Sequence, residues 1–307
     1  GIRKEAEKRV VEVAERRGWT PAELADRTAP TAGFELDETD GRPVLRLDLG
    51  QRTLLARLDA ELSVVLDKGD GKVSKAFPKP RKDDEPTLAA AAKRAFSAAK
   101  KQAKQTVQMQ STRFYDAMCV GQRWDLETWR TYLWGHPIVG RLCERLVWIA
   151  MRGDTLLSSF RPLGDGTLTD VDDEPLELAE DVEIALAHRT LVGETLAVRW
   201  RAHLADYEIT PLFPQFGDAP FELAEAARDA LVLDELEGHM LHAFTLRGAL
   251  TKRGYTRGSA EDGGIFHTYH RHFPTLRLAA TVEFSGSSLP EENRPVALLG
   301  ITFSRSR

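Results

Sequence analysis

The chain has 307 residues, of which 42% are hydrophobic and 29% charged, and its formal net charge is −5. This composition is typical of a folded globular protein and excludes a chain that is disordered throughout. The apolar runs are shorter than the roughly 20 residues that a membrane-spanning helix needs, and no signal peptide opens the chain. We therefore expect a cytoplasmic protein that does not contact a membrane, and the negative charge argues against nucleic-acid binding over the whole surface.

Two cysteines in a chain of this size exclude a disulfide framework, and neither lies in a CxxC pair. We expect both to be buried free thiols. The first residue is Gly1 rather than methionine, and a charged helical pattern is already running at that point. This beginning predicts that the chain is cut from a longer protein.

The N-terminal third is predicted to hold two helices and a small sheet. Residues 3–17 form an amphipathic pattern that ends at Gly18, and Thr20-Pro21 opens a short second helix. Leucines then alternate with polar residues, which predicts an antiparallel meander at about 43–76. The acidic turn near Asp70 lacks the spacing and the closing Glu of an EF-hand calcium loop, so a tight hairpin turn is the preferred interpretation.

A proline-bounded charged connector at 78–86 precedes a long helix at about 87–118. Small apolar residues recur along this helix at three-four spacing, which predicts that one face is buried. Basic residues from Lys93 to Lys104 lie on the same segment. They indicate either a solvated surface or a contact with a phosphate backbone.

Residues 119–151 hold four of the six tryptophans and both cysteines, so we expect this Trp-rich stretch to form the central core. Asp125 is expected to cap one helix and Pro137 to begin a second, and the run at 146–151 is expected to be a buried strand. A hairpin, a strand at 182–189 and a helix around Trp200 are predicted next. Nine acids and no Lys or Arg lie between residues 165 and 183, which marks that stretch as acidic.

Three prolines within 210–220 predict a boundary between domains. Beyond it we expect helices at 221–231 and 235–254 and strands at 264–272, 275–284 and 295–303. The predicted fold class is α+β, with a helix-rich larger domain (1–210) that contains small antiparallel sheets. The smaller C-terminal domain (211–307) is expected to pack helices on a three-stranded sheet.

Five residues of the C-terminal domain are candidate metal ligands. Glu235, His239 and His242 are spaced to share one face of the predicted helix, and His270 and His272 are spaced to share one face of a strand. If the two faces meet, these side chains would form a zinc or iron site. The HExxH and CxxC signatures are absent, so ordinary half-exposed histidines are the alternative.

The segment 251–259 is a candidate phosphate or nucleic-acid contact because Lys252, Arg253, Tyr255 and Arg257 alternate with glycines after a helix. The alternative is an ordinary helix C-terminus with Gly254 as its capping residue. Neither the P-loop nor the GxGxxG spacing is present, and no GxSxG motif marks a nucleophile. Catalytic residues are therefore not assigned.

Several ordered motifs carry a resemblance to a known family: GWTPAELADRTAPTAG, then FYDAMCVGQRWDLETWRTYLWGHPIVGRLCERLVWIAM, then AHLADYEITPLFPQF. Together they resemble an uncharacterised domain that occurs toward the C-terminal end of long bacterial proteins of the MolR-like type (molybdate metabolism regulator-like). Some of those proteins also carry a WGR domain. The resemblance implies a regulatory setting and no catalytic residues.

We therefore expect a non-catalytic regulatory or interaction module of a larger bacterial protein, without a required cofactor. Its partner is expected to be another domain of that protein or a separate protein. One alternative is a metal-dependent enzyme or metal-binding domain that uses the five candidate ligands. A further alternative is nucleic-acid contact through the basic residues of 93–104 and 252–257.

Overall fold

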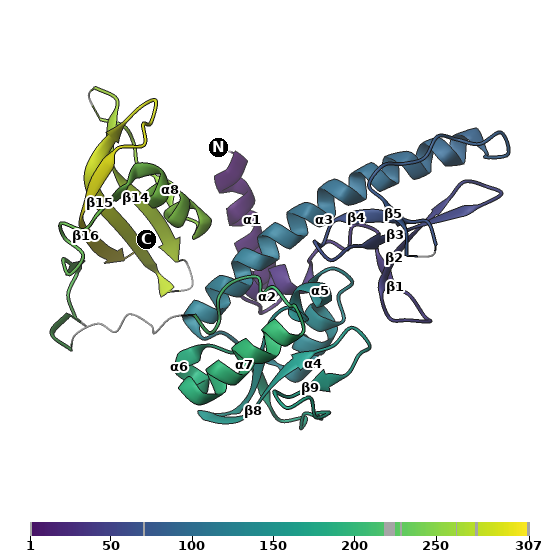
Figure 1. Ribbon diagram of the computed structural model, residues 1–307, viewed down its shortest axis with the longest axis horizontal. Helices are drawn as coiled ribbons and strands as arrows, with labels where there is room; N and C mark the ends of the chain where they lie inside the picture. The colour runs from purple at the N-terminus through teal and green to yellow at the C-terminus, as the bar shows by residue number, and fades with distance from the viewer. Residues whose placement is uncertain are drawn as a thin grey trace. The chain divides into compact units, whose positions relative to one another are not determined.

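The structure is a computed structural model that describes residues 2–69, 71–217, 225–227, 229–261, 263–273 and 276–305 (Figure 1). The chain divides into two compact units, residues 1–219 and 220–307. Both units combine helices with antiparallel strands, so the predicted α+β fold class is confirmed. Of the helices within the described ranges, none has both the length and the apolar content needed to cross a bilayer.

Two helices open the first unit, as predicted. Helix α1 (Ile2–Arg16) is followed by Gly18, whose φ of +68° turns the chain. Helix α2 (Pro21–Arg27) begins with a capping box. In this box the Thr20 hydroxyl accepts the Glu23 N–H at 3.1 Å and the Glu23 carboxylate accepts the Thr20 N–H at 2.7 Å. These reciprocal bonds satisfy two backbone donors that a helix start leaves free.

The predicted meander is an antiparallel sheet in the strand order β1-β2-β3-β4-β5. Its strands are β1 (Glu35–Leu36), β2 (Pro43–Asp48), β3 (Thr53–Leu58), β4 (Val64–Asp67) and β5 (Val73–Ser74). Side chains alternate between the two faces of a strand. The residues on one face of the meander are therefore buried together, among them Leu47, Ala56 and Val64.

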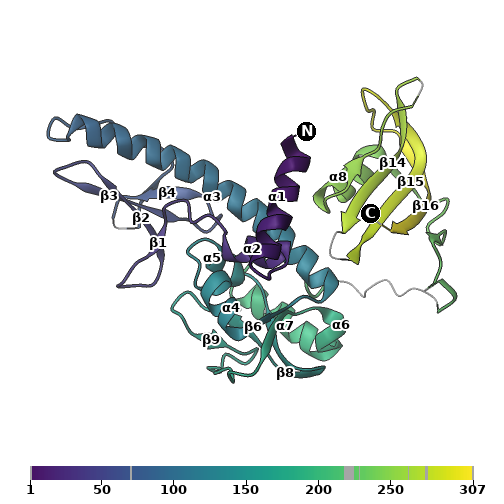
Figure 2. The ribbon, with the colours of Figure 1, turned by 180° about the vertical axis from the view of Figure 1, so that it is seen from behind.

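Helix α3 (Pro86–Val120) spans both halves of the first unit (Figure 2). The Glu85 carboxylate caps its start by accepting the N–H groups of Thr87 at 3.1 Å and Leu88 at 2.6 Å. Small residues and Phe96 on its first half pack against the meander, whereas Phe114 on its second half packs into the Trp-rich core. At roughly 1.5 Å per residue the helix is about 50 Å long, so one element connects two separate cores.

The Trp-rich stretch forms the core of the first unit, as predicted. It supplies helix α4 (Leu126–Thr128), the π-helix η1 (Trp129–Trp134), helix α5 (Val139–Cys143) and two strands of the second sheet. That sheet has the order β6-β10-β7-β8-β9, with β6 (Arg123–Asp125), β7 (Trp148–Arg152), β8 (Thr155–Pro162), β9 (Leu168–Thr169) and β10 (Glu183–Leu186). Trp148 is fully buried, with the rings of Trp129 and Phe114 each 5.5 Å away. Edge-to-face contacts of this kind add to the apolar area that the rings bury.

The opposite face of the second sheet is covered by helix α7 (Glu194–Asp206), which follows the short helix α6 (Arg189–Val192). Trp200 of α7 is fully buried and its indole N–H donates to the Ser159 hydroxyl at 2.9 Å. Gln215 connects the end of the first unit to the residues beside β7 and β10. Its amide N–H group donates to the carbonyl oxygens of Val147 (2.7 Å) and Ala187 (2.9 Å), while its carbonyl oxygen accepts the Val147 N–H at 2.9 Å.

The two cysteines have different environments. Cys143 in α5 is buried, as predicted, and burial raises the pKa of its thiol well above the usual value. Cys119 is exposed, so the prediction that both thiols are buried is wrong for this residue. It lies in the last turn of α3, on a side of the helix away from Phe114 and Ala117, which face the core.

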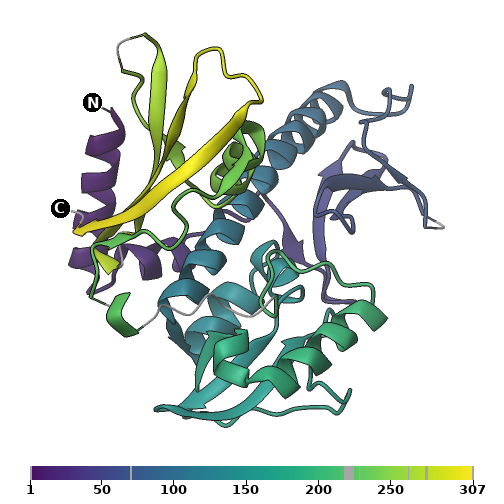
Figure 3. The ribbon, with the colours of Figure 1, turned by 60° about the vertical axis from the view of Figure 1, so that its left-hand side comes forward.

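The second unit is one antiparallel sheet with a helix on one face (Figure 3). The strand order is β11-β16-β15-β14-β13, and β12 also pairs with β16. The bounds are β11 (Val232–Leu233), β12 (Met240–His242), β13 (Thr256–Arg257), β14 (Ile265–Phe273), β15 (Leu278–Ser288) and β16 (Pro295–Arg305). Leu246 of helix α8 (Ala243–Lys252) packs with Phe266, Tyr269 and Phe284 of the sheet. The three predicted strands are thus confirmed, and shorter strands extend the sheet beyond them.

The prediction of a helix at 235–254 is wrong for the first half of that segment. Gly238 has a φ of +79° in a turn, and β12 then pairs with β16, so the helix begins only at Ala243. The Gly238 N–H donates to the Leu298 carbonyl at 2.8 Å, which shows that a strand partner from far along the chain overrides the helical spacing. The helix predicted at 221–231 lies partly outside the described residues. Within them a single 3-10 turn, η2 (Glu225–Ala227), is present.

Candidate ligand pocket

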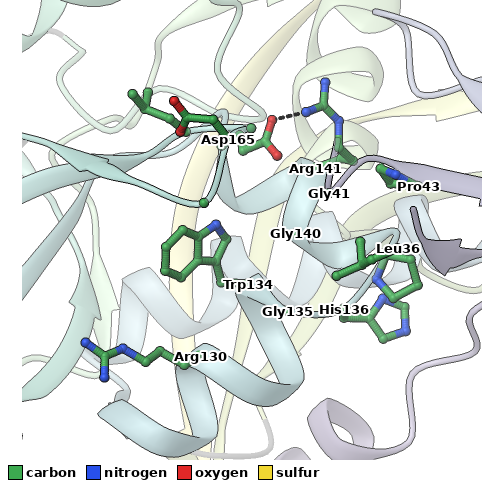
Figure 4. Close-up of a pocket in the computed structure, with 15 residues that line it drawn as sticks. Leu36, Gly41, Pro43, Arg130, Trp134, Gly135, His136, Gly140, Arg141 and Asp165 are labelled. Atoms are coloured by element: carbon green, nitrogen blue, oxygen red, sulfur yellow. Dashed lines mark hydrogen bonds and ion pairs between the residues drawn. The ribbon is translucent and has the colours of Figure 1, made fainter. Parts of the chain in front are cut away.

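A pocket of about 350 Å³ lies in the first unit where three segments meet (Figure 4). They are the β1–β2 connection, the corner between η1 and α5, and the turn between β8 and β9. The indole of Trp134 lies in the pocket, and Leu36, Pro43 and Leu163 add apolar lining. Arg130, Arg141, Glu144 and Asp165 add charged groups of both signs. We call this site the Trp134 pocket.

The corner that carries Trp134 requires glycine at two positions. A Cβ atom at Gly140 would collide with the carbonyl oxygen of Trp134, and one at Gly135 would lie 2.7 Å from the carbonyl oxygen of Arg130. The end of η1 and the start of α5 can therefore approach closely only because these residues lack side chains. The close approach fixes the position of the Trp134 backbone at the pocket.

His136 holds the same corner in place. Its Nδ1 accepts the N–H groups of Ile138 and Val139, each at 3.1 Å, and its Nε2 lies 3.0 Å from the carbonyl oxygen of Ala29. Because Nδ1 accepts, the hydrogen-bond network assigns the ring proton to Nε2, which donates to Ala29. Burial lowers the pKa of His136, which favours the neutral ring. Both ring nitrogens are engaged, so His136 acts as a structural cap of α5.

Glu144 is a partly buried carboxylate that pairs with Arg141 beside the pocket. Burial raises the pKa of Glu144, and the charges of Arg141, Arg161 and Arg42 act in the opposite direction. Arg161 is itself buried, which lowers the pKa of its guanidinium. Arginine charge near the carboxylate thus offsets only part of its loss of hydration, because the pKa stays raised.

Asp165 is engaged in the turn that it begins. One of its oxygens accepts the N–H of Thr167 at 3.0 Å and the Thr167 hydroxyl at 2.6 Å, and these bonds lower the pKa of the carboxyl group. The titratable groups of His136, Glu144 and Asp165 therefore each serve a structural contact. The ring of Trp134 packs 5.2 Å from the ring of Trp129 and stays half-buried at the pocket.

The five candidate metal ligands are not gathered by the structure. Glu235 and His239 lie in the turn before β12 and His242 at the end of that strand, so the shared helical face does not exist. His270 and His272 lie on β14, opposite Thr281 and Ala279 of β15. Within the described ranges, no three His, Cys, Asp or Glu side chains are placed to hold a metal ion.

His270 has a hydrogen-bonding role that sequence reasoning missed. Its Nε2 lies 2.9 Å from the Thr268 hydroxyl and its Nδ1 lies 2.9 Å from the Thr281 hydroxyl. Both hydroxyls project from the same face of the sheet as His270, because Thr268 is two residues away and Thr281 is its cross-strand partner. The sequence could have indicated the contact with Thr268, because a threonine two residues before a strand histidine lies on the same face. The contact with Thr281 could not be predicted without the register between β14 and β15.

The basic segment at 251–259 ends helix α8. The Gly254 N–H donates to the Thr251 carbonyl and the Tyr255 N–H to the Leu250 carbonyl, each at 3.0 Å, with Gly254 at a φ of +79°. This pair of bonds is a Schellman motif. Lys252 is exposed in the last turn of α8, and the guanidinium of Arg253 donates to the Ala249 carbonyl at 3.2 Å. The observed bonds are those of a helix cap, and phosphate binding here stays a prediction.

The aromatic and basic residues that follow this cap pack within their own unit. Tyr255 is half-buried against the core of the second unit, and the guanidinium of Arg257 lies 5.1 Å from the centre of the Phe266 ring. A cation over a ring face gains a modest electrostatic stabilisation. These contacts account for the positions of both side chains.

The protein is thus an α+β protein, and its first unit has an open pocket lined by the half-buried ring of Trp134. A family model described as "Domain of unknown function (DUF4132)" matches residues 71–255, more than half of the chain. The chain belongs to this family. It is also similar to the uncharacterized protein YehI of Escherichia coli (strain K12), with 31% identity over 258 residues. That alignment covers 83% of this chain and 21% of the relative, so the chain spans about a fifth of the length of the curated relative. No solved structure matches.

Proposed function

We propose that the chain is a non-catalytic interaction module, regulatory in role, of a larger bacterial protein in the cytoplasm. Its partner is an extended segment of another polypeptide, either a separate protein or another domain of the same protein. The resemblance to MolR-like, WGR-associated proteins and the much greater length of YehI support such a setting. The single observation that carries the proposal is the half-buried Trp134 ring in an open pocket.

The pocket has the composition of a protein interface. Trp134, Leu36 and Pro43 provide an aromatic and apolar centre, and Leu36 remains 45% exposed. Arg130 and Asp165 provide a charged rim of both signs. Aromatic anchors inside a polar rim dominate the binding energy at protein interfaces. Because the titratable groups of the pocket serve structural contacts, binding is favoured over catalysis.

The test begins with a phage-displayed library of random peptides that is selected against the whole protein. The selected peptides are then labelled, and their Kd values are measured by fluorescence anisotropy for the wild type and Leu36→Asp. We expect binding to weaken by about ten-fold or more, because a charge would replace an apolar anchor. Leu191→Asp is the matched control, since Leu191 is 48% exposed on α6 and lies outside the pocket.

Two results would contradict the proposal. One is a selection that enriches no peptide. The other is a set of peptides that bind Leu36→Asp as tightly as the wild type, which would place the interaction elsewhere. Far-ultraviolet circular dichroism and a thermal melt of each variant separate lost binding from lost folding.

A further inference from the structure

The segment from Lys68 to Lys104 carries a concentration of positive charge. Over these residues the sequence has eleven basic side chains against four acidic ones, whereas the whole chain has a net charge of −5. The eleven are Lys68, Lys72, Lys75, Lys79, Arg81, Lys82, Lys93, Arg94, Lys100, Lys101 and Lys104. Each of them is exposed. Like charges held together cost free energy unless a partner of opposite charge offsets them.

Helix α3 aligns five of these residues. At 100° per residue, Lys93, Arg94, Lys100, Lys101 and Lys104 fall within an arc of about 120° and extend over about 16 Å of helix axis. We call these five residues the basic face. The buried residues Ala92, Phe96, Ala99 and Ala103 point away from it into the meander core. The Lys100 ammonium donates to the Lys75 carbonyl at 2.9 Å, which brings the end of the β4–β5 hairpin beside the same face.

The basic face is not neutralised within the described part of the chain, where none of its five residues forms an ion pair. Among the ion pairs of the described residues, none joins an acid of the stretch 165–183 to the basic face. Four acids of this stretch pair with arginines elsewhere in the first unit: Asp172 with Arg199, Glu180 with Arg130, Asp181 with Arg152 and Glu183 with Arg123. The basic face is therefore available to an external polyanion.

We infer that the basic face binds the phosphate backbone of double-stranded nucleic acid without reading its sequence. Lysine ammonium groups on a straight helix act as point charges suited to phosphates, and duplex DNA presents about one negative charge per 1.7 Å of axis. Phe96, the aromatic residue among 86–104, is buried, so the face offers no ring on which bases of a single strand would stack. An anionic membrane fits less well, because the apolar side of α3 is already packed and cannot insert into lipid.

This inference goes beyond the proposed function. It rests on the proposed function only in the premise that the chain acts by binding. The two surfaces are also separate, since the Trp134 pocket includes no residue of α3. Failure of one interaction therefore leaves the other testable. Leu36→Asp should keep its affinity for duplex, and the basic-face variant should keep its affinity for the selected peptides.

The experiment is fluorescence anisotropy with a labelled 24-base-pair DNA duplex of arbitrary sequence, at salt concentrations from 50 to 200 mM. The test variant is Lys93→Glu/Lys101→Glu/Lys104→Glu, which spares the Lys100 contact with Lys75. The control is Arg277→Glu/Arg294→Glu/Arg305→Glu, which makes the same change in net charge at exposed positions of the second unit, outside the candidate contact at 252–257. A second duplex of different sequence, a single strand of equal length and vesicles containing phosphatidylserine are measured in parallel.

We expect the wild type to bind both duplexes equally, with an affinity that falls steeply with salt. Neutralising about four phosphates gives a slope of about −3.6 in a plot of log K against log salt. The test variant should bind at least about ten-fold more weakly, and the control should change by less than about three-fold. Absent or salt-insensitive duplex binding, or an equal loss in both variants, would overturn the inference. Tighter binding to vesicles or to the single strand would also overturn it.

Discussion

The indole N–H of Trp124 donates to the carboxylate of Asp26 across 3.0 Å and so joins helix α2 to the aromatic core. Asp26 is buried and also pairs with Arg113 at 2.8 Å. Burial is the largest influence on this carboxyl group and raises its pKa, although the charge of Arg113 and the bond from Trp124 act in the opposite direction. Two donors thus stabilise a charge that burial disfavours.

Asp26→Ala should strongly destabilise the first unit, because the Trp124 indole loses its acceptor and the Arg113 guanidinium loses its ion-pair partner. Breaking one side of a buried pair costs about 3–5 kcal/mol. Urea unfolding followed by tryptophan fluorescence measures the change. Asp154→Ala is the control, since this carboxylate is fully exposed and pairs with Arg123 at the surface, where such a pair contributes no more than about 1 kcal/mol. Similar losses in the two variants would contradict the prediction.

Asp84 should make stability depend on pH in the acid range. Arg52 donates two hydrogen bonds of 2.8 Å to its carboxylate and thereby lowers the pKa of Asp84 to about 2. An unfolded Asp titrates near a pKa of about 3.9. Because the folded pKa is the lower one, the stabilisation is fully present above the unfolded value and is lost as the pH falls toward about 2.

The measurement for Asp84 is the melting temperature of the wild type and of Asp84→Asn between pH 5 and pH 2. We expect the gap between the two proteins to be largest at the upper end of this range and to close as the pH falls. Asp154→Asn provides the reference for an exposed carboxylate. A gap for Asp84→Asn that stays constant down to pH 2 would contradict the assignment.

Gly140→Ala should damage the corner that carries Trp134, because the added Cβ meets the Trp134 carbonyl oxygen. Forcing an extra carbon into a packed site costs about 1–3 kcal/mol. Gly248→Ala in α8 is the matched control. Its Cβ would meet nothing within 4 Å, and alanine is favoured over glycine in a helix by about 0.5–1 kcal/mol. Thermal melts should therefore show opposite shifts, and equal shifts would refute the close approach.

Much of the first unit could be predicted because its signals are local. The Thr20 and Asp125 caps, the alternating leucines of the meander and the three-four spacing of α3 each act within a few residues. The turn and strand at 234–242 could not be predicted in this way. Its helical spacing is local, whereas the pairing of β12 with β16 that overrides it comes from more than fifty residues away.

The pocket was hidden from the sequence for a similar reason. Its lining comes from three segments, near residues 36–43, 130–144 and 163–166, and no spacing rule connects them. The motif WGHPIVGR lies in the Trp-rich stretch that is predicted as core, and its residues 137–140 are indeed buried. His136 is not singled out from the sequence, and its contact with Ala29 comes from more than a hundred residues earlier. Sequence reasoning located the elements, but it could not locate a site assembled by long-range contacts.

His270 should stabilise the second unit through its two hydroxyl partners rather than through a metal ion. His270→Val removes the bonds to Thr268 and Thr281 and should cost about 1–2 kcal/mol. His239→Ala is the matched control, because His239 is exposed in a turn and its loss should change stability by no more than about 0.5 kcal/mol. Thermal melts of both variants and of the wild type, each with and without EDTA, check the prediction. A metal site built on both histidines would instead make the two variants equally unstable, and EDTA would lower the melting temperature of the wild type to theirs.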